Sequence, residues 1–430
     1  MKKVQSISRR SFIKSTGAGL LGLQAFPAVL RKVRPSDTIR LAHIGLGGMG
    51  NRHMEWFSSF PDVDIVALCD VDEIRLRKTY RTLQELKPGI KADTYSDFRR
   101  IIERKDIDAV TCATPDHWHA LIAMQAFQAG KDVYGEKPLS YSLREAQVMK
   151  ETLDRHGNIF QLGTQIHASE NYRRIAEIIQ SGILGKIHTV HLWKTGGSRG
   201  FGFPPVVNPP ETLDWDMWLG PAPYSEYIPV KCHGTFRYFF DYSGGVFADF
   251  WCHIADILYF SLDPKELYSI EARGESPDDG IADTPRWIDV DFRFKDLDVF
   301  WTTTPPPFPR AAEWHIGAHF EGDRGSLTCT YRDRIINIDG EVMEDIPEVS
   351  RKIPRSPGHQ RNFIDCVKSR EPADSNLAYA RKMTIPMHLA LISFRLKRKL
   401  MWNSEKEMFE DDKAANYLLS REYRKPWSLF

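Results

Sequence analysis

The stretch Ile39-Arg40-Leu41-Ala42-His43-Ile44-Gly45-Leu46-Gly47-Gly48-Met49-Gly50 determines the fold of the first half of the chain. An apolar strand pattern runs directly into a Gly-x-Gly-x-x-Gly turn, and a helical pattern follows to about Phe60. The first glycine permits a tight turn, the second lets the backbone approach a pyrophosphate, and the third allows close packing of helix on strand. Amides at the helix N-terminus then face the phosphates. The expected dinucleotide contacts in this turn are Gly45, Gly47, Gly48, Met49 and Gly50.

A second strand pattern over Val63–Cys69 ends at Asp70, twenty residues after the last glycine of the turn. A carboxylate at this place binds both ribose hydroxyls of an adenosine and repels a 2′-phosphate, so we expect NAD rather than NADP as the cofactor. Arg75 and Arg77 follow closely and have the charge to bind that phosphate, which leaves NADP as the weaker alternative.

Strand and helix patterns then alternate up to Leu162, as in a parallel, doubly wound sheet. A capping box of Ser142 and Glu145 opens one of the helices, and Gly157 ends it. We expect strands over residues 92–95, 109–113, 132–134 and 159–162, and helices over residues 96–104, 118–128 and 143–156.

The stretch Val133-Tyr134-Gly135-Glu136-Lys137-Pro138-Leu139 places a charged pair at the end of a buried strand, because Pro138 cannot donate to a strand ladder. Ligands bind at this carboxyl edge of open parallel sheets, and residues 114–119 and 163–165 follow strands at the same edge. The two histidines of residues 114–119 suit either helix capping around a packed indole or, for His119, a place beside the nicotinamide. The expected cofactor contacts here are Thr114, Pro115, His119, Glu136, Lys137 and Gln165.

From about residue 187 the pattern changes to long strands of period two. Apolar residues from Ile288 to Phe294 alternate with Asp289, Asp291 and Arg293, which is typical of an open antiparallel sheet with one solvated face. We therefore expect an α/β protein, with an N-terminal doubly wound Rossmann domain over residues 36–165 and a C-terminal α+β domain over residues 166–430. The open, mostly antiparallel sheet of the second domain is expected to be a contact between copies.

Residues 196–245 form a long irregular section rich in proline, glycine and aromatic residues. A loop of this length and aromatic content is usually functional rather than disordered. Aromatic faces with nearby arginine and aspartate suit a sugar, while an ordered loop that packs its own small core is the alternative for any single ring. The expected substrate contacts are Arg237, Tyr238, Asp241 and His167.

Asp249 and His253 follow on a helical pattern, where their i, i+4 spacing places them on one face, close enough to act on the same atom. A capping aspartate and a buried core histidine would have the same spacing. No cluster of histidine, cysteine or carboxylate residues has the spacing of a metal site, so no metal is expected, although His167, His233 and His253 are free to converge in space. The six cysteines are scattered, which argues against a disulfide framework.

The first 35 residues contain Ser8-Arg9-Arg10-Ser11-Phe12-Ile13-Lys14 and a short apolar run, the features of a twin-arginine export signal, with a disordered basic tail as the alternative. We expect a periplasmic or otherwise exported protein. No later stretch reaches membrane-spanning length, so no membrane insertion is expected after signal removal. The 58 basic and 57 acidic residues nearly balance, which argues against a nucleic-acid partner.

Three of these signals together resemble one family, that of glucose-fructose oxidoreductase, inositol dehydrogenase and rhizopine catabolism (Gfo/Idh/MocA). They are the glycine turn of residues 45–50, Glu136-Lys137-Pro138, and the pair Asp249 and His253. Residues 213–221 and 359–363 resemble its exported branch in carbohydrate-degrading bacteria. The resemblance covers nearly the whole mature chain and implies a Rossmann domain followed by an open-sheet substrate domain, in a homodimer or homotetramer.

The resemblance implies that Lys137 is the catalytic lysine, that His253 is the acid/base and that Asp249 is its partner. The implied reaction is oxidation of a secondary hydroxyl of a sugar or glycoside, with hydride transfer to tightly bound nicotinamide. A redox-neutral, NAD-dependent glycoside hydrolase is the first alternative, and a non-catalytic sugar-binding protein on the same fold is the second.

Overall fold

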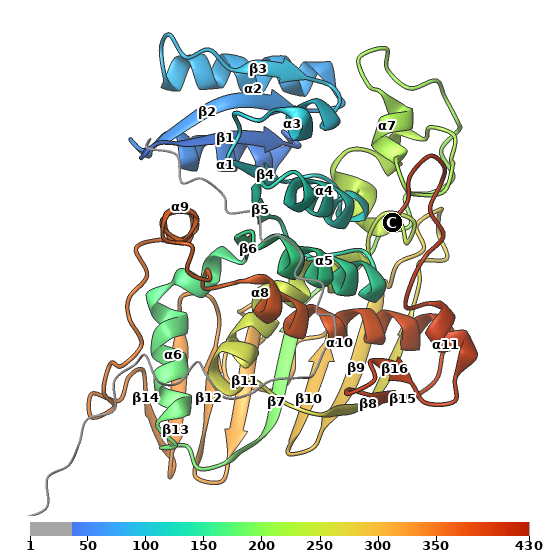
Figure 1. Cartoon of the computed structure of the whole chain (residues 1–430). Coiled ribbons are helices and arrows are strands. Elements are labelled where there is room, and N and C mark those ends of the chain that lie inside the picture. The colour runs from blue at the N-terminus through green and yellow to red at the C-terminus, as the bar shows by residue number, and fades with distance from the viewer. Residues whose placement is uncertain (1–36, 430) are drawn as a thin grey trace, which may run out of the picture. The chain divides into compact units, whose positions relative to one another are not determined.

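The computed structural model describes residues 37–429 (Figure 1). The expected export signal and linker, residues 1–35, lie outside the described residues. Two sheets organise the described part, a six-stranded sheet that ends at Leu162 and a ten-stranded sheet that follows it.

The first sheet has the strand order β3-β2-β1-β4-β5-β6, and all its strands pair in parallel. The expected doubly wound sheet is thereby confirmed. The strand order reverses between β1 and β4, the place where ligands bind in this topology. Its elements are β1 (Ile39–Ile44), α1 (Gly48–Ser58), β2 (Val63–Cys69), α2 (Glu73–Leu86), β3 (Asp93–Tyr95), α3 (Arg99–Glu103), β4 (Ala109–Cys112), α4 (Asp116–Gln128), β5 (Asp132–Gly135), α5 (Leu143–His156) and β6 (Phe160–Leu162).

Helix α5 begins and ends where its sequence predicts. The Ser142 side chain accepts a hydrogen bond from the backbone N–H of Glu145, and the Glu145 carboxylate accepts one from the backbone N–H of Tyr141. These two bonds satisfy amides that the first helical turn leaves unpaired. Gly157 ends the helix with a φ of 66°, a conformation that glycine adopts without steric cost. The orientation of α5 beside the loop 136–139 is thus fixed locally.

The second sheet has the order β14-β13-β12-β11-β7-β10-β9-β8-β15-β16 and is antiparallel except for the pair of β7 and β10. Its strands are β7 (Ile187–Lys194), β8 (Leu267–Glu275), β9 (Trp287–Phe294), β10 (Leu297–Thr302), β11 (Ile316–Gly322), β12 (Gly325–Cys329), β13 (Arg334–Ile338), β14 (Glu341–Met343), β15 (Leu400–Asn403) and β16 (Met408–Phe409). The expected open, mostly antiparallel sheet is confirmed. Further helices are η1 (Gln165–Ala168), α6 (Glu170–Gln180), α7 (Trp215–Leu219), η2 (Pro229–Lys231), η3 (Gly234–Tyr238), α8 (Gly245–Leu262), α9 (His359–Ser369), α10 (Leu377–Leu396) and α11 (Lys413–Tyr417).

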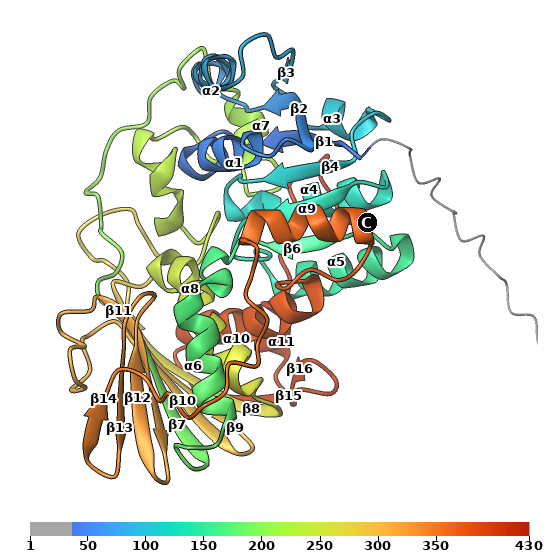
Figure 2. The same cartoon turned by 90° about the vertical axis from the view of Figure 1, so that its left-hand side faces the viewer.

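The two faces of this sheet differ in character. Figure 2 shows helices α6, α8 and α10 on one side of it only. The strand register aligns Phe292, Val299, Val190, Phe320 and Leu327 in one row on the helix-covered face, and all five are fully buried. Burial of such a row under helices stabilises this layer by removing apolar surface from water.

Helix α8 lies in the core of the second layer. At 18 residues it is long and apolar enough to cross a membrane, so the expectation that no later stretch reaches that length is wrong for this helix. Two thirds of it is buried inside the protein, as in the core helix of a soluble domain, and one or two such helices are weak evidence for a span. Its apolar character comes from contacts on several sides, with the second sheet, α6 and α10.

Helix α9 belongs by sequence to the second half of the chain but packs against the first sheet. Its residues Phe363 and Ile364 share one buried cluster with Leu41, Phe57 and Tyr134. In both views α9 lies beside β6 (Figures 1 and 2). The hydrophobic core under the first sheet is therefore completed by a segment about 200 residues further along the chain.

Candidate active site

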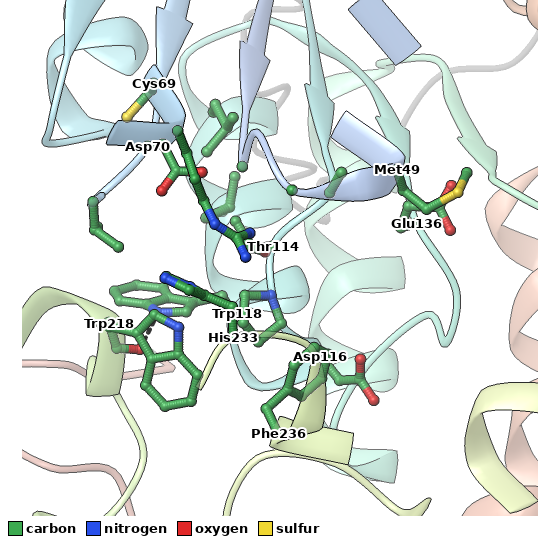
Figure 3. A pocket seen from close by; sticks show the side chains of 18 of the residues that line it. Met49, Cys69, Asp70, Thr114, Asp116, Trp118, Glu136, Trp218, His233 and Phe236 are labelled. Carbon is green, nitrogen blue, oxygen red and sulfur yellow. Dashed lines mark hydrogen bonds between the residues drawn. The ribbon is translucent and has the colours of Figure 1, made fainter. Parts of the chain in front are cut away.

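A cavity lies at the carboxyl edge of the first sheet (Figure 3). One side of it consists of the glycine turn and of the loops after β2, β4 and β5. The opposite side comes from the irregular section that precedes α8, which contributes Met217, Trp218, His233, Phe236 and Arg237. The cavity thus lies at the edge where the strand pattern predicts a ligand.

The glycine turn has the shape of a dinucleotide cradle. Gly45 has a φ of +84°, and a Cβ added there would lie 2.7 Å from the backbone of Ala113. A Cβ at Gly50 would lie 1.8 Å from the carbonyl oxygen of Gly45. A Cβ at Gly47 would meet the Arg75 guanidinium at 2.8 Å, on the side that faces the cavity. Gly45 and Gly50 thus admit only glycine, whereas a side chain at position 47 would displace the flexible end of Arg75. The residues present fit a pyrophosphate against the backbone.

Asp70 lies in the cavity wall directly after β2. Its carboxylate accepts hydrogen bonds from the backbone N–H of Leu46 at 2.6 Å and of Asp72 at 2.9 Å, so it also supports the glycine turn. Burial raises the pKa of this carboxyl group, against the effect of the two backbone bonds. Of the two nearby arginines, Arg75 lines the cavity, whereas Arg77 pairs with Glu73 at the surface of α2.

Glu136 is held on the cavity wall by a network that the sequence did not reveal. Its carboxylate accepts hydrogen bonds from Nε2 of His53 at 2.9 Å and from the Gln165 side-chain amide at 3.2 Å. Burial alone would raise the pKa of Glu136, but the bond from His53 and nearby positive charges lower it. His53 is fully buried on α1, so the helix of the glycine turn is tied directly to the loop that carries Lys137.

Lys137 forms a charged cluster with α8 and η3. Its Nζ donates to the Asp249 carboxylate and, at 2.9 Å, to the Asp249 carbonyl oxygen, and Nε of Arg237 lies 3.0 Å from the same carboxylate. Burial would raise the pKa of Asp249, but Lys137 and Arg237 hold it well below its usual range. Burial would lower the pKa of Lys137, but Asp249 and Glu136 raise it. All three cluster residues are therefore charged at neutral pH.

His253 lies one helical turn after Asp249 but does not share that cluster's bonds. Its ring contacts Phe250 and Tyr331, with centroid separations of 5.9 and 6.0 Å, and its Nδ1 is buried without a hydrogen-bond partner among the described residues. Burial and then the charge of Lys137 lower its pKa to about 4. The carboxylate of Asp249 bonds to Lys137 and Arg237, so the expected role of Asp249 as the partner of His253 is not what these contacts display.

Several residues expected at the site lie elsewhere. Nδ1 and Nε2 of His119 lie 2.7 Å from the carbonyl oxygen of Pro138 and 2.9 Å from that of Thr114, which ties two loops together behind the cavity. His167 is buried against Asp256 at 3.0 Å. Tyr238 packs its ring on Phe201. Among the residues predicted to contact substrate, only Arg237 lines the described cavity; His167, Tyr238 and Asp241 do not.

The three histidines considered for a metal do not converge. Nε2 of His233 lies 2.8 Å from the Asp72 carboxylate, while His167 bonds to Asp256. Within residues 37–429 there is no group of three or more histidine, cysteine or carboxylate side chains placed to hold a metal ion. All six cysteines are free thiols, five of them buried.

Asp116 is a buried carboxyl group of the cavity that sequence reasoning missed. It follows Pro115 at the start of α4, and its carboxylate accepts a hydrogen bond from the Ser243 hydroxyl at 2.5 Å. Burial raises its pKa. Asp116 and Phe236 both line the cavity (Figure 3). The position of Asp116 directly after the threonine-proline step was the available signal.

The aromatic-rich section closes over the cofactor side of the cavity, and we call residues 211–239 the roof. Its backbone pairs with the turn before α2, through Glu73 N–H to Thr212 O at 2.9 Å and Asp214 N–H to Val71 O at 3.0 Å. The Trp118 indole donates to the Trp218 carbonyl oxygen, the dashed line in Figure 3. Most of the roof's rings pack in a small core of their own, together with Leu213 and Leu219, so the alternative interpretation holds for these aromatic residues: Trp215, Trp218, Phe236 and Phe239.

Two family models match nearly all of the described chain. Residues 39–164 match the oxidoreductase family's NAD-binding Rossmann fold, and residues 169–429 match its C-terminal alpha/beta domain. The chain belongs to the Gfo/Idh/MocA oxidoreductase family. The expected resemblance to this family and the expected NAD-binding domain are thereby confirmed.

The individual Gfo/Idh/MocA relatives compared with this chain have low sequence identity to it. WlbA dehydrogenase from Bordetella pertussis, solved with NADH and UDP-GlcNAcA, superimposes with a TM-score of 0.62 at 17% identity, covering 85% of this chain and 99% of that one. Aldose-aldose oxidoreductase from Caulobacter crescentus gives a TM-score of 0.61 at 16% identity, with 85% and 99% coverage. A glycosyl hydrolase family 109 protein from Shewanella baltica is 24% identical over 206 residues, covering 43% of this chain and 45% of the relative. The match thus spans less than half of that curated relative, and the structural likeness concerns the fold.

Proposed function

We propose that the protein oxidises a secondary hydroxyl of a sugar or glycoside and transfers the hydride to an NAD that stays bound. The observation that supports this most directly is the juxtaposition, at the NAD cradle, of the charged cluster of Lys137, Asp249 and Arg237 with the uncharged His253. Hydroxyl oxidation needs a base for the proton and a positive charge for the developing alkoxide. Lys137 and Arg237 line the cavity, and His253 follows Asp249 by one turn on α8.

The proposed steps use this chain's own groups. His253 accepts the hydroxyl proton, because it is uncharged at neutral pH. Lys137 donates a hydrogen bond to the alkoxide oxygen, and its charge is maintained by Asp249 and Glu136. Asp249 and Arg237 hold the ammonium group in place from α8 and η3. When bound, the nicotinamide supplies the carbon that accepts the hydride.

The roof supports the proposal that the cofactor is retained between turnovers. It crosses from the second layer to the β2–α2 turn and is fastened there by backbone bonds and by the pair of His233 and Asp72. Release of a dinucleotide from under it requires several of these bonds to open together. Retention suits the proposed export through the signal of residues 8–14, since free nucleotide is scarce outside the cytoplasm.

The test begins with protein purified without added nucleotide. Its absorbance near the reduced-nicotinamide band is recorded, and a panel of glycosides is then added while that band and sugar release are followed. A lasting rise of the band without cleavage supports the dehydrogenase. Absence of any bound or bindable nucleotide would exclude it.

A redox-neutral glycoside hydrolase is the second candidate. Similarity to relatives named glycosyl hydrolase family 109 proteins favours it. The roof favours it too, because a cofactor that stays bound suits a reaction in which the hydride returns to the sugar. The buried carboxyl group of Asp116 is a further acid in the same cavity. Sugar release with an unchanged reduced-nicotinamide band at steady state would favour this candidate over the dehydrogenase.

A further inference from the structure

Two buried polar atoms lie near each other on the substrate side of α8 without a hydrogen-bond partner in the described chain. They are Nδ1 of His253 and the hydroxyl of Tyr331. The two rings are 6.0 Å apart. Buried polar atoms are normally paired, and unpaired ones at a reacting centre indicate groups that a ligand or water completes. Neither atom takes part in the hydrogen bonds of the charged cluster of Lys137, although His253 follows Asp249 by one turn of α8.

The topology of the second sheet brings Lys194 to the same place. Strand β11 pairs antiparallel with both β7 and β12, so β7 and β12 run in the same direction. Lys194 ends β7, and Tyr331 follows the end of β12, so both lie at one edge of the sheet. Helix α8 contacts both β7 and β11. Lys194 and Tyr331 lie 149 and 286 positions after Gly45 in the sequence, and the strand ends bring both to one edge of the second sheet.

Lys194 has few partners there. Its Nζ donates to the carbonyl oxygen of Thr195 at 2.6 Å and lies 4.9 Å from the centroid of the Phe250 ring. No carboxylate pairs with it in the part of the chain that the structure describes. Burial lowers its pKa, and the charge of Asp249 acts in the opposite direction. An ammonium group with open donor positions beside an aromatic face is suited to oxygen atoms of a ligand.

We propose that Lys194, Phe250 and Tyr331 form the seat of the substrate's sugar ring, next to His253. This proposal rests on the proposed function and assigns its substrate side. The Phe250 face takes an apolar C–H patch of the ring, and the Lys194 ammonium and Tyr331 hydroxyl donate to ring substituents. Both groups would bind a sugar oxygen, which belongs either to a hydroxyl group or to the carboxylate of a uronic acid.

A structural role for the Tyr331 hydroxyl predicts a different effect of Tyr331→Phe than a role in sugar binding does. If the hydroxyl served the fold, Tyr331→Phe would lower the melting temperature of the ligand-free protein. If the hydroxyl instead binds the ligand and is unpaired without it, Tyr331→Phe leaves the melting temperature unchanged or raises it and weakens only sugar binding. The comparison separates the two roles without any assay of turnover.

The experiment measures sugar binding by calorimetry on the NAD-loaded protein. The probes are methyl glycosides of neutral hexoses and the corresponding methyl uronides. The variants are Lys194→Met and Tyr331→Phe. The matched controls are Lys186→Met, at the opposite end of β7 and exposed with Asp296, and Tyr268→Phe, exposed on β8.

We expect each seat variant to weaken the best-binding sugar at least tenfold, with both controls within twofold of wild type and with NAD affinity unchanged. A Lys194→Met effect confined to uronides identifies a carboxylate ligand, and an equal effect on both sugar classes identifies a hydroxyl. Unaltered sugar affinity in both seat variants overturns the seat while leaving the proposed function standing. No sugar binding to wild type overturns both.

Discussion

At the scale of single residues, Lys137 and His253 carry the proposed chemistry by different means. Lys137→Ala removes the charge that stabilises the alkoxide, and His253→Ala removes the base. Each is expected to lower turnover by a factor of about 100 or more, the range of single electrostatic and acid–base groups. Rates of sugar-dependent reduction of bound NAD provide the measurement.

The control for these variants is cofactor content. Neither Lys137→Ala nor His253→Ala touches the glycine turn, so both purified proteins should bind as much NAD as wild type. Near-native turnover in either variant would remove that residue from the mechanism. His388→Gln supplies a matched histidine control, because His388 is buried outside the NAD cavity and bonds to Ser140.

The pH profile follows from the environment of His253. The group works as a base only when unprotonated, and burial together with Lys137 lowers its pKa to about 4. We therefore expect kcat/KM to stay level from neutral pH down to about 5 and to fall tenfold per pH unit below about 4. Stopped-flow reduction of bound NAD between pH 3.5 and 8 measures it. An acid limb near 6.5, the ordinary histidine value, would show that another environment surrounds the catalytic base.

At the scale of elements, the roof controls access to the cofactor. His233 on the roof donates to Asp72, the N-cap residue of α2, and a hydrogen bond to a charged group contributes about 1.5 kcal/mol. His233→Ala should therefore raise the NAD dissociation rate about tenfold, as measured by capture of released NAD with a second dehydrogenase. Lys231→Ala is the control, since Lys231 bonds to Ser225 within the roof. Equal dissociation rates in His233→Ala and wild type would mean that the roof does not limit release.

The elements differ in how far the sequence predicts them. Strand β2 was predicted to the residue, because its apolar run is short and ends directly at Asp70. The roof was predicted only as an irregular aromatic section. The roof is held to the turn before α2 by backbone hydrogen bonds such as that from Glu73 N–H to Thr212 O. These bonds do not depend on side-chain type, so the sequence pattern does not predict them. The packing of α9 on the first sheet could not be predicted for a related reason, because an apolar helix face does not indicate which surface it packs against.

The candidate site divides in the same way. Gly45, Asp70 and Lys137 were found because local backbone geometry or strand ends require those residue types at those positions. The i, i+4 spacing placed Asp249 beside His253 on one helix face, yet the Asp249 carboxylate pairs with Lys137 and Arg237. The partners of Asp249 are determined by the positive charges of Lys137, on the loop after β5, and of Arg237, on η3. Spacing along one helix gives proximity, and the partner is decided by the tertiary structure.

At the scale of the whole molecule, buried histidines make stability depend on pH. Burial lowers the pKa of His43, His117 and His388 to about 3 and that of His359 to about 4. Unfolded histidines titrate near 6.5, so below that pH the unfolded chain binds more protons than the native one. Stability is fully present above pH 6.5 and is lost as pH falls toward 4.

We expect the free energy of unfolding to drop by several kcal/mol between pH 7 and pH 5, because each such histidine contributes up to about 2 kcal/mol at pH 5. Urea unfolding at pH 7, 6 and 5 measures the change. His388→Gln should flatten the dependence. An unfolding free energy that is level over this range would indicate that these histidines are solvated in the native protein.

The open face of the second sheet is the surface through which we expect copies to associate. The strand register places Asp291, Phe300, His191, His319 and Thr328 in one row on that face, opposite the buried row that faces the helices. His191 stacks on Phe300 at 4.9 Å, and Phe308 stacks on His319 at 3.9 Å. His319 and Thr328 are buried, whereas Asp291, His191 and Phe300 remain partly exposed. An aromatic stripe flanked by charges is the composition of an interface core with a polar rim.

Phe300→Glu places a charge in the middle of that stripe, and it should convert a dimer or tetramer into a monomer in light-scattering measurements at micromolar concentration. Phe203→Glu is the matched control, because Phe203 is 78% exposed in the section before α8, away from the sheet. The introduced carboxylate would have to be desolvated in the interface, at a cost that an association of this size does not offset. Since Phe300 lies on the face opposite α8, the monomer should retain NAD and the His253 pH profile. A wild-type protein that is monomeric at these concentrations would show that the stripe serves another purpose.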